Sequence, residues 1–121
     1  MKNLLIAFSL SLLISSVALA ADTATKTVEQ VYKEMTQLKG QQVTVSGKVV
    51  KVNNGIMHRN FVHVQDGTGG ADSNNLIVTS KQTARVGDKV TITGTVVLGT
   101  DFGMGYSYPL LVENSSITIN K

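Results

Sequence analysis

The sequence contains no cysteine. This absence excludes thiol redox chemistry, zinc sites with cysteine ligands and covalent haem attachment through a Cys-x-x-Cys-His motif. It also excludes a lipid-modified cysteine after the N-terminal segment. A domain of this size can fold without disulfides when its core is adequate.

Aromatic residues and charge are also sparse. Phenylalanine, tyrosine and tryptophan make up 5% of the chain, and the net charge is +3. A charge this mild does not imply nucleic acid or an anionic membrane as the partner. The carboxylates show no pairing typical of acid–base catalysis, and no serine has a neighbouring base, so we expect a protein without enzyme activity.

The N-terminus has the three parts of a secretory signal peptide. Lys2 supplies a positive charge, residues 4–19 form an apolar run, and Ala18-Leu19-Ala20 is a small-residue cleavage site. The alternative is a membrane anchor, but the run contains four serines and is shorter than the about 20 apolar residues of a spanning helix. We expect cleavage after Ala20, no membrane span in the product, and a periplasmic location, with outright secretion as the alternative.

Removal of residues 1–20 takes away one of the 11 basic residues and none of the 8 acidic ones, which leaves a net charge of +2. Residues 21–27 then form a flexible lead, and residues 28–121 have a length that suits one domain with one core. The sequence thus predicts a signal peptide, a lead and a single folded domain.

One helix is expected at 28–39. Thr27 and Gln30 fit a capping box, and Gly40 stands where a helix would stop. Apolar residues follow at helical spacing between them: Val28, Val31, Tyr32, Met35 and Leu38.

The rest of the chain has the alternation of strands with glycine-rich turns. The expected strand segments are 42–52, 61–65, 76–79, 89–98, and 108–112 with 117–119. This pattern predicts an all-β fold, a five-stranded OB-fold barrel with an N-terminal amphipathic helix. Gly47 and Gly94 lie inside strands, where glycine often marks a bulge at which a sheet coils. The segment 81–87 has room for a single helical turn at most, so helix 28–39 would cover the open end of the barrel.

Two loops flank the binding face of an OB barrel, and here they are 53–60 and 99–107. In the expected strand 61–65, Val62 and Val64 should face the core, whereas Phe61, His63 and Gln65 should face the ligand. The candidate ligand-binding residues are Met57, His58, Arg59, Phe61, His63, Phe102, Met104 and Tyr106. For the apolar members, capping one end of the barrel core is the alternative role.

Four of these residues carry the side chains that favour Cu(I), which are thioether and imidazole. They are Met57, His58, His63 and Met104. Their spacing matches no fixed metal motif, so copper or haem iron is a hypothesis, and ordinary surface histidines are the alternative. The nearby Asp66-Gly67-Thr68-Gly69 lacks the further ligands of a calcium or phosphate loop, and we expect a tight turn there.

Several segments of the chain resemble one known family. The matching patterns are Leu38-x-Gly40-x-x-Val43-x-Val45-x-Gly47-x-Val49, Asn60-Phe61-Val62-x-Val64-x-Asp66-Gly67-Thr68-Gly69 and Val86-Gly87-Asp88-x-Val90-x-Ile92-x-Gly94. They are similar to small exported bacterial OB-fold proteins of the nucleic-acid-binding-domain type, the NrfJ-like proteins often labelled DNA-binding. Residues 57–63 and 102–109 look like signature segments of that subgroup.

The resemblance implies a periplasmic binding module in genomes rich in c-type cytochromes. Our leading expectation is a module that handles metal or haem during maturation of a respiratory protein. Binding of a single-stranded oligonucleotide through Arg59, Phe61 and Tyr106 is the second, although few aromatic and basic residues line such a groove. A protein-interaction module of the cell envelope is the third.

Overall fold

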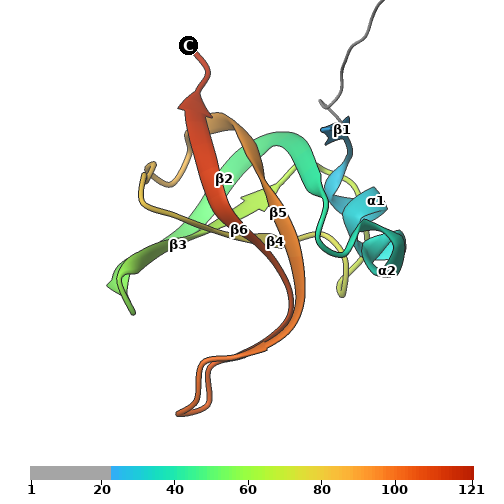
Figure 1. The fold of residues 1–121 in the computed structure, drawn as a ribbon. Coiled ribbons are helices and arrows are strands. Elements are labelled where there is room, and N and C mark those ends of the chain that lie inside the picture. Colours follow the sequence, from blue (N-terminus) through green and yellow to red (C-terminus); the bar gives the residue numbers. More distant parts are fainter. Residues whose placement is uncertain (1–22) are drawn as a thin grey trace, which may run out of the picture.

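Six strands of the chain form one sheet that closes on itself (Figure 1). The computed structural model describes residues 23–121, so the predicted signal peptide, 1–20, lies outside the described residues. The elements are β1 (Ala24–Thr25), α1 (Val28–Lys33), α2 (Met35–Leu38), β2 (Gln42–Ile56), β3 (Arg59–Gln65), β4 (Leu76–Ser80), β5 (Lys89–Asp101) and β6 (Ser107–Ile119). In the part of the chain that is described, no helix is long and apolar enough to cross a membrane. The expected all-β class is confirmed.

The sheet has the order β1-β2-β3-β4-β6-β5, and a further pairing between β2 and β5 completes a ring of hydrogen-bonded strands. β2 pairs with a different strand along each half of its length, and this closes the ring. Its first half pairs with β5 from Gln42 to Lys48, and its second half pairs with β3 from Lys48 to Ile56. β4 and β6 meet in parallel at Val78 and Val112.

Gly94 lies at a bulge, as the sequence predicts, whereas at Gly47 the structure shows the close approach of another strand. A Cβ atom on Gly47 would lie 2.6 Å from the carbonyl oxygen of Gln65, at the point where β2 leaves β5 for β3. Gly94 coincides with a register shift between β5 and β6. Both positions need a residue without a side chain because another strand passes too close.

The inside of the ring is filled mainly by valine. The fully buried residues of largest volume in this core include Leu76 and Ile92, and Val62 and Val64 of β3 face it as predicted. The two helices cover one end, where Val28, Val31 and Leu38 join the same core.

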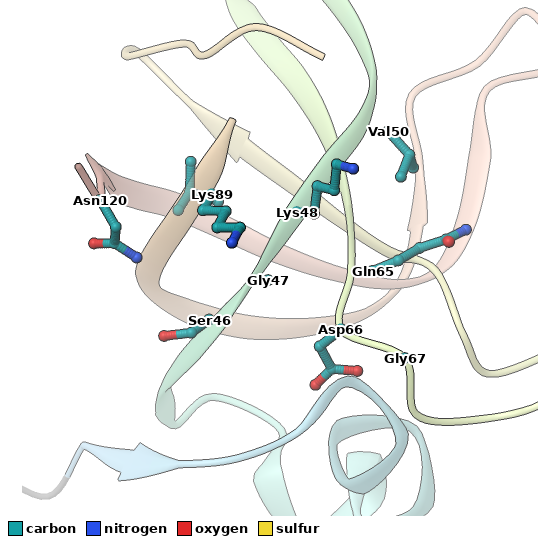
Figure 2. Close-up of a pocket in the computed structure, with 10 residues that line it drawn as sticks. Ser46, Gly47, Lys48, Val50, Gln65, Asp66, Gly67, Lys89 and Asn120 are labelled. Atoms are coloured by element: carbon teal, nitrogen blue, oxygen red, sulfur yellow. The ribbon is translucent and has the colours of Figure 1, made fainter. Parts of the chain in front are cut away.

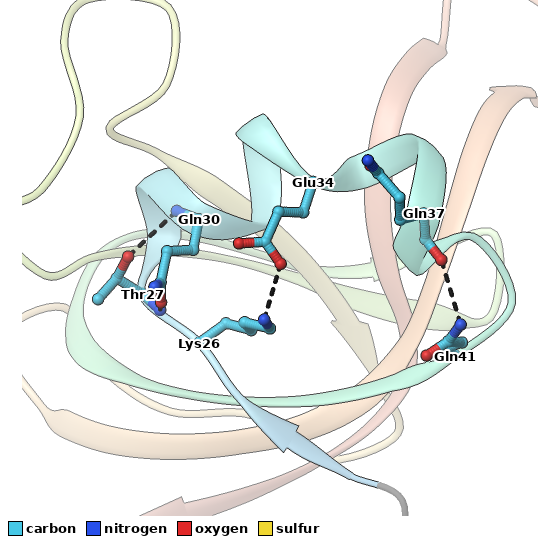
Figure 3. A network of polar contacts seen from close by, with 6 residues as sticks. All are labelled: Lys26, Thr27, Gln30, Glu34, Gln37 and Gln41. Carbon is cyan, nitrogen blue, oxygen red and sulfur yellow. Dashed lines mark hydrogen bonds and ion pairs between the residues drawn. The ribbon is translucent and has the colours of Figure 1, made fainter.

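The helical segment begins as predicted and is then interrupted (Figure 3). The hydroxyl of Thr27 accepts from the Gln30 N–H at 3.1 Å, and the Gln30 side chain accepts from the Thr27 N–H at 2.8 Å, which completes the capping box. Glu34 leaves the helical conformation with φ −107° and ψ 14°, so the expected helix 28–39 is two short helices. The Glu34 carboxylate forms an ion pair with the Lys26 ammonium group at 2.7 Å.

The described part of the expected flexible lead is an ordered strand. β1 pairs in parallel with β2, and the Lys26 N–H donates to the Thr44 carbonyl at 2.9 Å. A two-residue strand gives too weak an alternation for recognition in a sequence.

The turn at Asp66-Gly67-Thr68-Gly69 also holds the start of α1. Asp66 Oδ2 accepts from the Val28 N–H at 2.9 Å, and the Thr68 hydroxyl accepts from the Glu29 N–H at 3.0 Å. These N–H groups have no partner inside the helix, and an anion near a helix N-terminus is favourable. The turn therefore joins the helical segment to the end of β3.

Candidate functional site

The loop expected at 53–60 is mostly strand. β2 extends to Ile56, which pairs with Arg59, so only Met57 and His58 form the turn. Both have positive φ, 52° and 64°, as the two central residues of a type I′ turn do. That turn prefers Asn-Gly, and a left-handed conformation is unfavourable for a residue with a Cβ. Unfavoured residues held at an exposed turn are a feature of functional sites.

The loop expected at 99–107 is a long hairpin whose strands pair as far as Asp101 and Ser107. The Phe102 N–H donates to the Tyr106 carbonyl at 2.8 Å and closes the tip. Met104 lies at the apex between Gly103 and Gly105, with φ 55° and a side chain that is 97% exposed. The hairpin therefore presents an apolar side chain to solvent.

Three aromatic rings fill the space between this hairpin and β3. The ring centroids of Phe61 and Phe102 lie 6.1 Å apart, those of Phe61 and Tyr108 5.5 Å, and those of Phe102 and Tyr108 5.9 Å. Distances in this range are typical of favourable aromatic pairs. Phe61 does lie on the outer face of β3, but it is only 3% exposed, so the expectation that its ring is open to a ligand is wrong. The other two rings cover it.

Arg59 lies across this aromatic cluster. Its guanidinium carbon is 4.9 Å from the Phe102 ring centroid, and its Nε is 3.3 Å from Glu113 Oε2. The same carboxylate oxygen accepts from the Thr79 hydroxyl at 3.0 Å. Arg59 also donates through Nη1 to the Met57 carbonyl at 3.2 Å, so one side chain connects the turn, the hairpin and β6. A cation held at three points is a preorganised contact group.

His63 lies further along the outer face of β3, beside Lys51 of β2 and Ile77 of β4. Its Nδ1 is 3.0 Å from the Asn75 Nδ2, and the Asn75 carbonyl accepts from the Tyr32 hydroxyl. Burial lowers the pKa of His63, and the charge of Lys51 lowers it further. His63 is therefore part of a network that reaches α1, at the far end of β3 from the Met57-His58 turn.

The four candidate copper ligands are not brought together. At about 3.3 Å per residue, the backbones of His58 and His63 are roughly 16 Å apart along the strand. Met104 is at the tip of a different hairpin, and Figure 1 shows the two tips apart from one another. Residues 23–121 contain no group of three or more His, Cys, Asp or Glu residues that could hold a metal ion. The arrangement does not fit a copper centre made of these four residues.

Two small recesses lie near the aromatic cluster, and Arg59 lines the second of them. One, of about 180 Å³, is lined by Phe61, Tyr106 and Tyr108 together with residues of β2. The other, of about 170 Å³, lies beside Met57, His58 and Lys81. Pockets for small molecules and cofactors measure about 300–1,000 Å³, so neither recess fits a haem. Each has the size of one protein side chain or a few water molecules.

Five of the eight predicted binding residues gather around these recesses. They are Met57, His58, Arg59, Phe61 and Tyr106, and Phe102 lies directly beneath Arg59. Tyr106 is 44% exposed and remains available for contact. His63 and Met104 lie apart. Glu113 and Thr79 belong to the site but were missed, because their position depends on the β4–β6 pairing and no pattern near Arg59 indicates it.

Searches against known protein families and against curated proteins gave no match. Solved structures do match. An OBody, AM3L09, bound to hen egg-white lysozyme has 23% sequence identity and a TM-score of 0.52, and the match covers 69% of this chain and 84% of the OBody. A chain assigned as an aspartyl-tRNA synthetase from Leishmania major Friedlin has 12% identity and a TM-score of 0.54, and the match covers 92% of this chain but 23% of the synthetase. At these identities the likeness concerns the fold alone.

Proposed function

We propose that this chain is a non-enzymatic OB-fold binding module of the periplasm that holds a segment of a partner protein between its β2–β3 turn and its β5–β6 hairpin. The observation that carries the proposal is the held position of Arg59 over the Phe102 ring of the Phe61–Phe102–Tyr108 cluster. Arg59 lines one side-chain-sized recess, and Phe61 and Tyr108 line another. Protein interfaces are anchored by arginine and aromatic residues that fill such recesses.

The OB-fold assignment is supported by the ring of strands. β2, β3, β4, β6 and β5 follow one another around the ring, as a five-stranded Greek-key barrel requires, and β1 is an addition at the edge. Similarity to an OBody is consistent with this assignment. The periplasmic location depends on the predicted signal peptide, and the resemblance to NrfJ-like proteins favours a respiratory protein as the partner.

The accessible residues of the site and of the hairpin tip beside it are of types that protein interfaces favour. Tyrosine, methionine and arginine are enriched there; Tyr106 and Met104 of the hairpin are exposed, and the Arg59 side chain is 33% exposed. A protein segment fits better than a metal or haem, since the candidate ligands are dispersed and the recesses are small. The proposal therefore includes no copper or haem site.

A photo-crosslinking amino acid at Met104 tests the proposal in cells. We expect a discrete crosslinked band from position 104, because this side chain projects beyond the hairpin. The matched control is the same amino acid at Val86, which is also exposed but belongs to the 81–87 segment. The double substitution Tyr106→Ser with Arg59→Gln should remove the band. Equal bands from both positions, or a band that survives the double substitution, would contradict the proposal.

Oligonucleotide binding is the second candidate, because Lys48, Lys51 and Lys89 form no ion pair within residues 23–121. Two observations speak against oligonucleotide binding. The charge of Arg59 is already paired with Glu113, and Tyr106 is the one strongly exposed aromatic residue of the described chain on which a base could stack. Affinity for single-stranded DNA that falls steeply with added salt would favour it, since phosphate contacts release counterions. Negligible affinity at low salt would exclude it.

A further inference from the structure

A second concave surface lies away from the two hairpin tips, where β2 passes from β5 to β3. Figure 2 shows this groove, whose lining includes Lys48, Val50, Gln65, Asp66 and Lys89. Its volume is about 550 Å³, within the range of about 300–1,000 Å³ that small organic ligands occupy. The two recesses of the candidate site, at about 170 and 180 Å³, lie below that range.

Two lysines stand directly opposite each other in this groove. Lys48 of β2 pairs with Lys89 of β5 in an antiparallel register, so both side chains leave the same face of the sheet. Like charges in this arrangement are destabilising. Neither ammonium group has an ion-pair partner among the described residues. The groove therefore has two positive charges that nothing in residues 23–121 compensates.

Asp66 is the carboxylate of the groove lining, but its oxygens are engaged elsewhere. Its Oδ2 accepts from the Val28 N–H, and its Oδ1 accepts from the N–H and the hydroxyl of Thr68. Figure 2 shows its carboxylate turned away from the two lysines, toward the helical segment. Asp66 thus serves the turn and α1, and the lysine charges remain available to an external anion.

The same groove has an apolar component. β2 shifts register against β3 between Val49 and Lys51, and Val50 is the extra residue of this bulge. A bulge redirects a side chain, and Val50 is one of the exposed large hydrophobic residues of the chain. Gly47 adds bare backbone to the wall, and the methylene chains of the lysines extend the apolar surface.

We infer that this groove binds a small amphipathic organic anion. The head group, a carboxylate or a phosphate, lies between the ammonium groups of Lys48 and Lys89, and the apolar body lies against Val50. An inorganic ion alone would leave most of the volume empty. The groove contains neither the Met57-His58 turn nor any residue of the β5–β6 hairpin tip, so this inference is independent of the proposed partner site.

Titration of the purified protein with four probes, followed by amide ¹H–¹⁵N spectra, tests the inference. Octanoate and octyl phosphate each combine an anion with an apolar chain, whereas octan-1-ol lacks the charge and inorganic phosphate lacks the chain. We expect saturable shifts at Gly47, Val50 and Lys89 with at least one of the two amphipathic anions. Whichever anion binds more tightly identifies the head group. Equal binding of octan-1-ol, or no saturable shift with either anion, would overturn the inference.

Variants separate this site from general surface charge. Lys48→Gln with Lys89→Gln should weaken binding of the anion at least about fivefold, because two surface charge contacts are lost. Lys39→Gln with Arg85→Gln removes two exposed charges outside the groove and should leave the affinity for the anion unchanged. In the absence of any probe, Lys48→Gln alone should raise the melting temperature, since it relieves the repulsion of Lys89. Unchanged affinity in the Lys48–Lys89 variant would overturn the inference, and crosslinking at Met104 should be unaffected by it.

Discussion

The Nε atom of Arg59 lies 3.3 Å from Oε2 of Glu113, and this ion pair joins β3 to β6 across the edge of β4. The Phe102 ring and the Thr79 hydroxyl contact this pair, and the Arg59 and Glu113 side chains are 33% and 15% exposed. A partly buried pair with additional hydrogen bonds is stronger than a surface pair, and the loss of one partner leaves the other uncompensated.

Glu113→Ala should destabilise the fold more than Glu113→Gln. Alanine leaves the buried Thr79 hydroxyl without an acceptor, which costs about 1–3 kcal/mol. Glutamine keeps an acceptor for Thr79 and loses only the partly exposed ion pair, so its cost should be about 1 kcal/mol or less. Urea unfolding of both variants measures the difference. If the two variants unfold alike, the Thr79 hydrogen bond contributes nothing.

Met57 and His58 should make the fold less stable than the residues that a type I′ turn prefers, because their side chains are kept for the proposed binding function. The double substitution Met57→Asn with His58→Gly supplies the two residue types that a type I′ turn prefers. Because each left-handed residue with a Cβ costs about 1 kcal/mol, the free energy of unfolding should rise by about 1–2 kcal/mol. The crosslinking yield at Met104 should fall at the same time. Met57→Leu is the control, since it keeps the strained turn and an apolar side chain, and it should change neither quantity.

His63 should make the fold less stable in mild acid. Burial and the charge of Lys51 hold its pKa below the ordinary value of 6.5. The stability it contributes is therefore complete above pH 6.5, where both states are neutral, and is lost as the pH falls through the folded-state pKa. Unfolding free energies between pH 7 and pH 5 should fall more in the wild type than in His63→Gln. The NMR titration of Lys51→Gln should give a higher His63 pKa, and a wild-type value at or above 6.5 would contradict the account.

At lower pH, Asp66 should be the main cause of the loss of folding stability. Burial alone would raise its pKa, but the hydrogen bonds from the Thr68 hydroxyl and from the N–H groups of Val28 and Thr68 bring the pKa below its ordinary value of 3.8. Its contribution is present above pH 3.8 and disappears as the pH falls through the folded-state pKa. Asp66→Asn should flatten the loss of stability between pH 4 and pH 2. Asp72→Asn, at an exposed carboxylate, should leave it unchanged.

The parts of the fold that could be predicted from the sequence depend on local rules. The capping box at Thr27 and Gln30 needs only four residues, and the inward side of β3 follows from the alternation of Val62 and Val64. Gly47 and Gly94 could be recognised because a glycine within a strand usually marks a bulge or the close approach of another strand. These features require no knowledge of what packs against them.

The remaining features depend on partners that are distant in the sequence. The length of β2 is set by its pairing with β3, which turns most of the expected loop 53–60 into strand. Phe61 is buried because the β5–β6 hairpin folds over it, about 40 residues later in the chain. The dispersal of His58, His63 and Met104 likewise follows from the separate positions of the two hairpins in the fold, which the spacing of residues along the chain does not show.

Gly94→Ala should be among the most damaging single substitutions in the chain. The added Cβ would overlap the Ser115 Oγ and lie 2.9 Å from the Glu113 carbonyl oxygen, so β5 and β6 would have to separate at the bulge. Forcing atoms into a packed region costs about 1–3 kcal/mol, and backbone can yield less than a side chain. We expect a loss at or above the upper end of this range in urea unfolding.

The same substitution has a second consequence, because Glu113 is next to the affected backbone. A shift of β6 at this point moves the carboxylate that holds Arg59, so crosslinking at Met104 should fall together with stability. Gly70→Ala is the matched control: a Cβ there meets nothing within 4 Å, and its φ is not positive, so both quantities should stay at the wild-type level. If Gly94→Ala lowers stability but leaves crosslinking intact in the folded fraction, then the position of Arg59 does not depend on β6, and Phe102 and the Met57 carbonyl alone hold Arg59 in place.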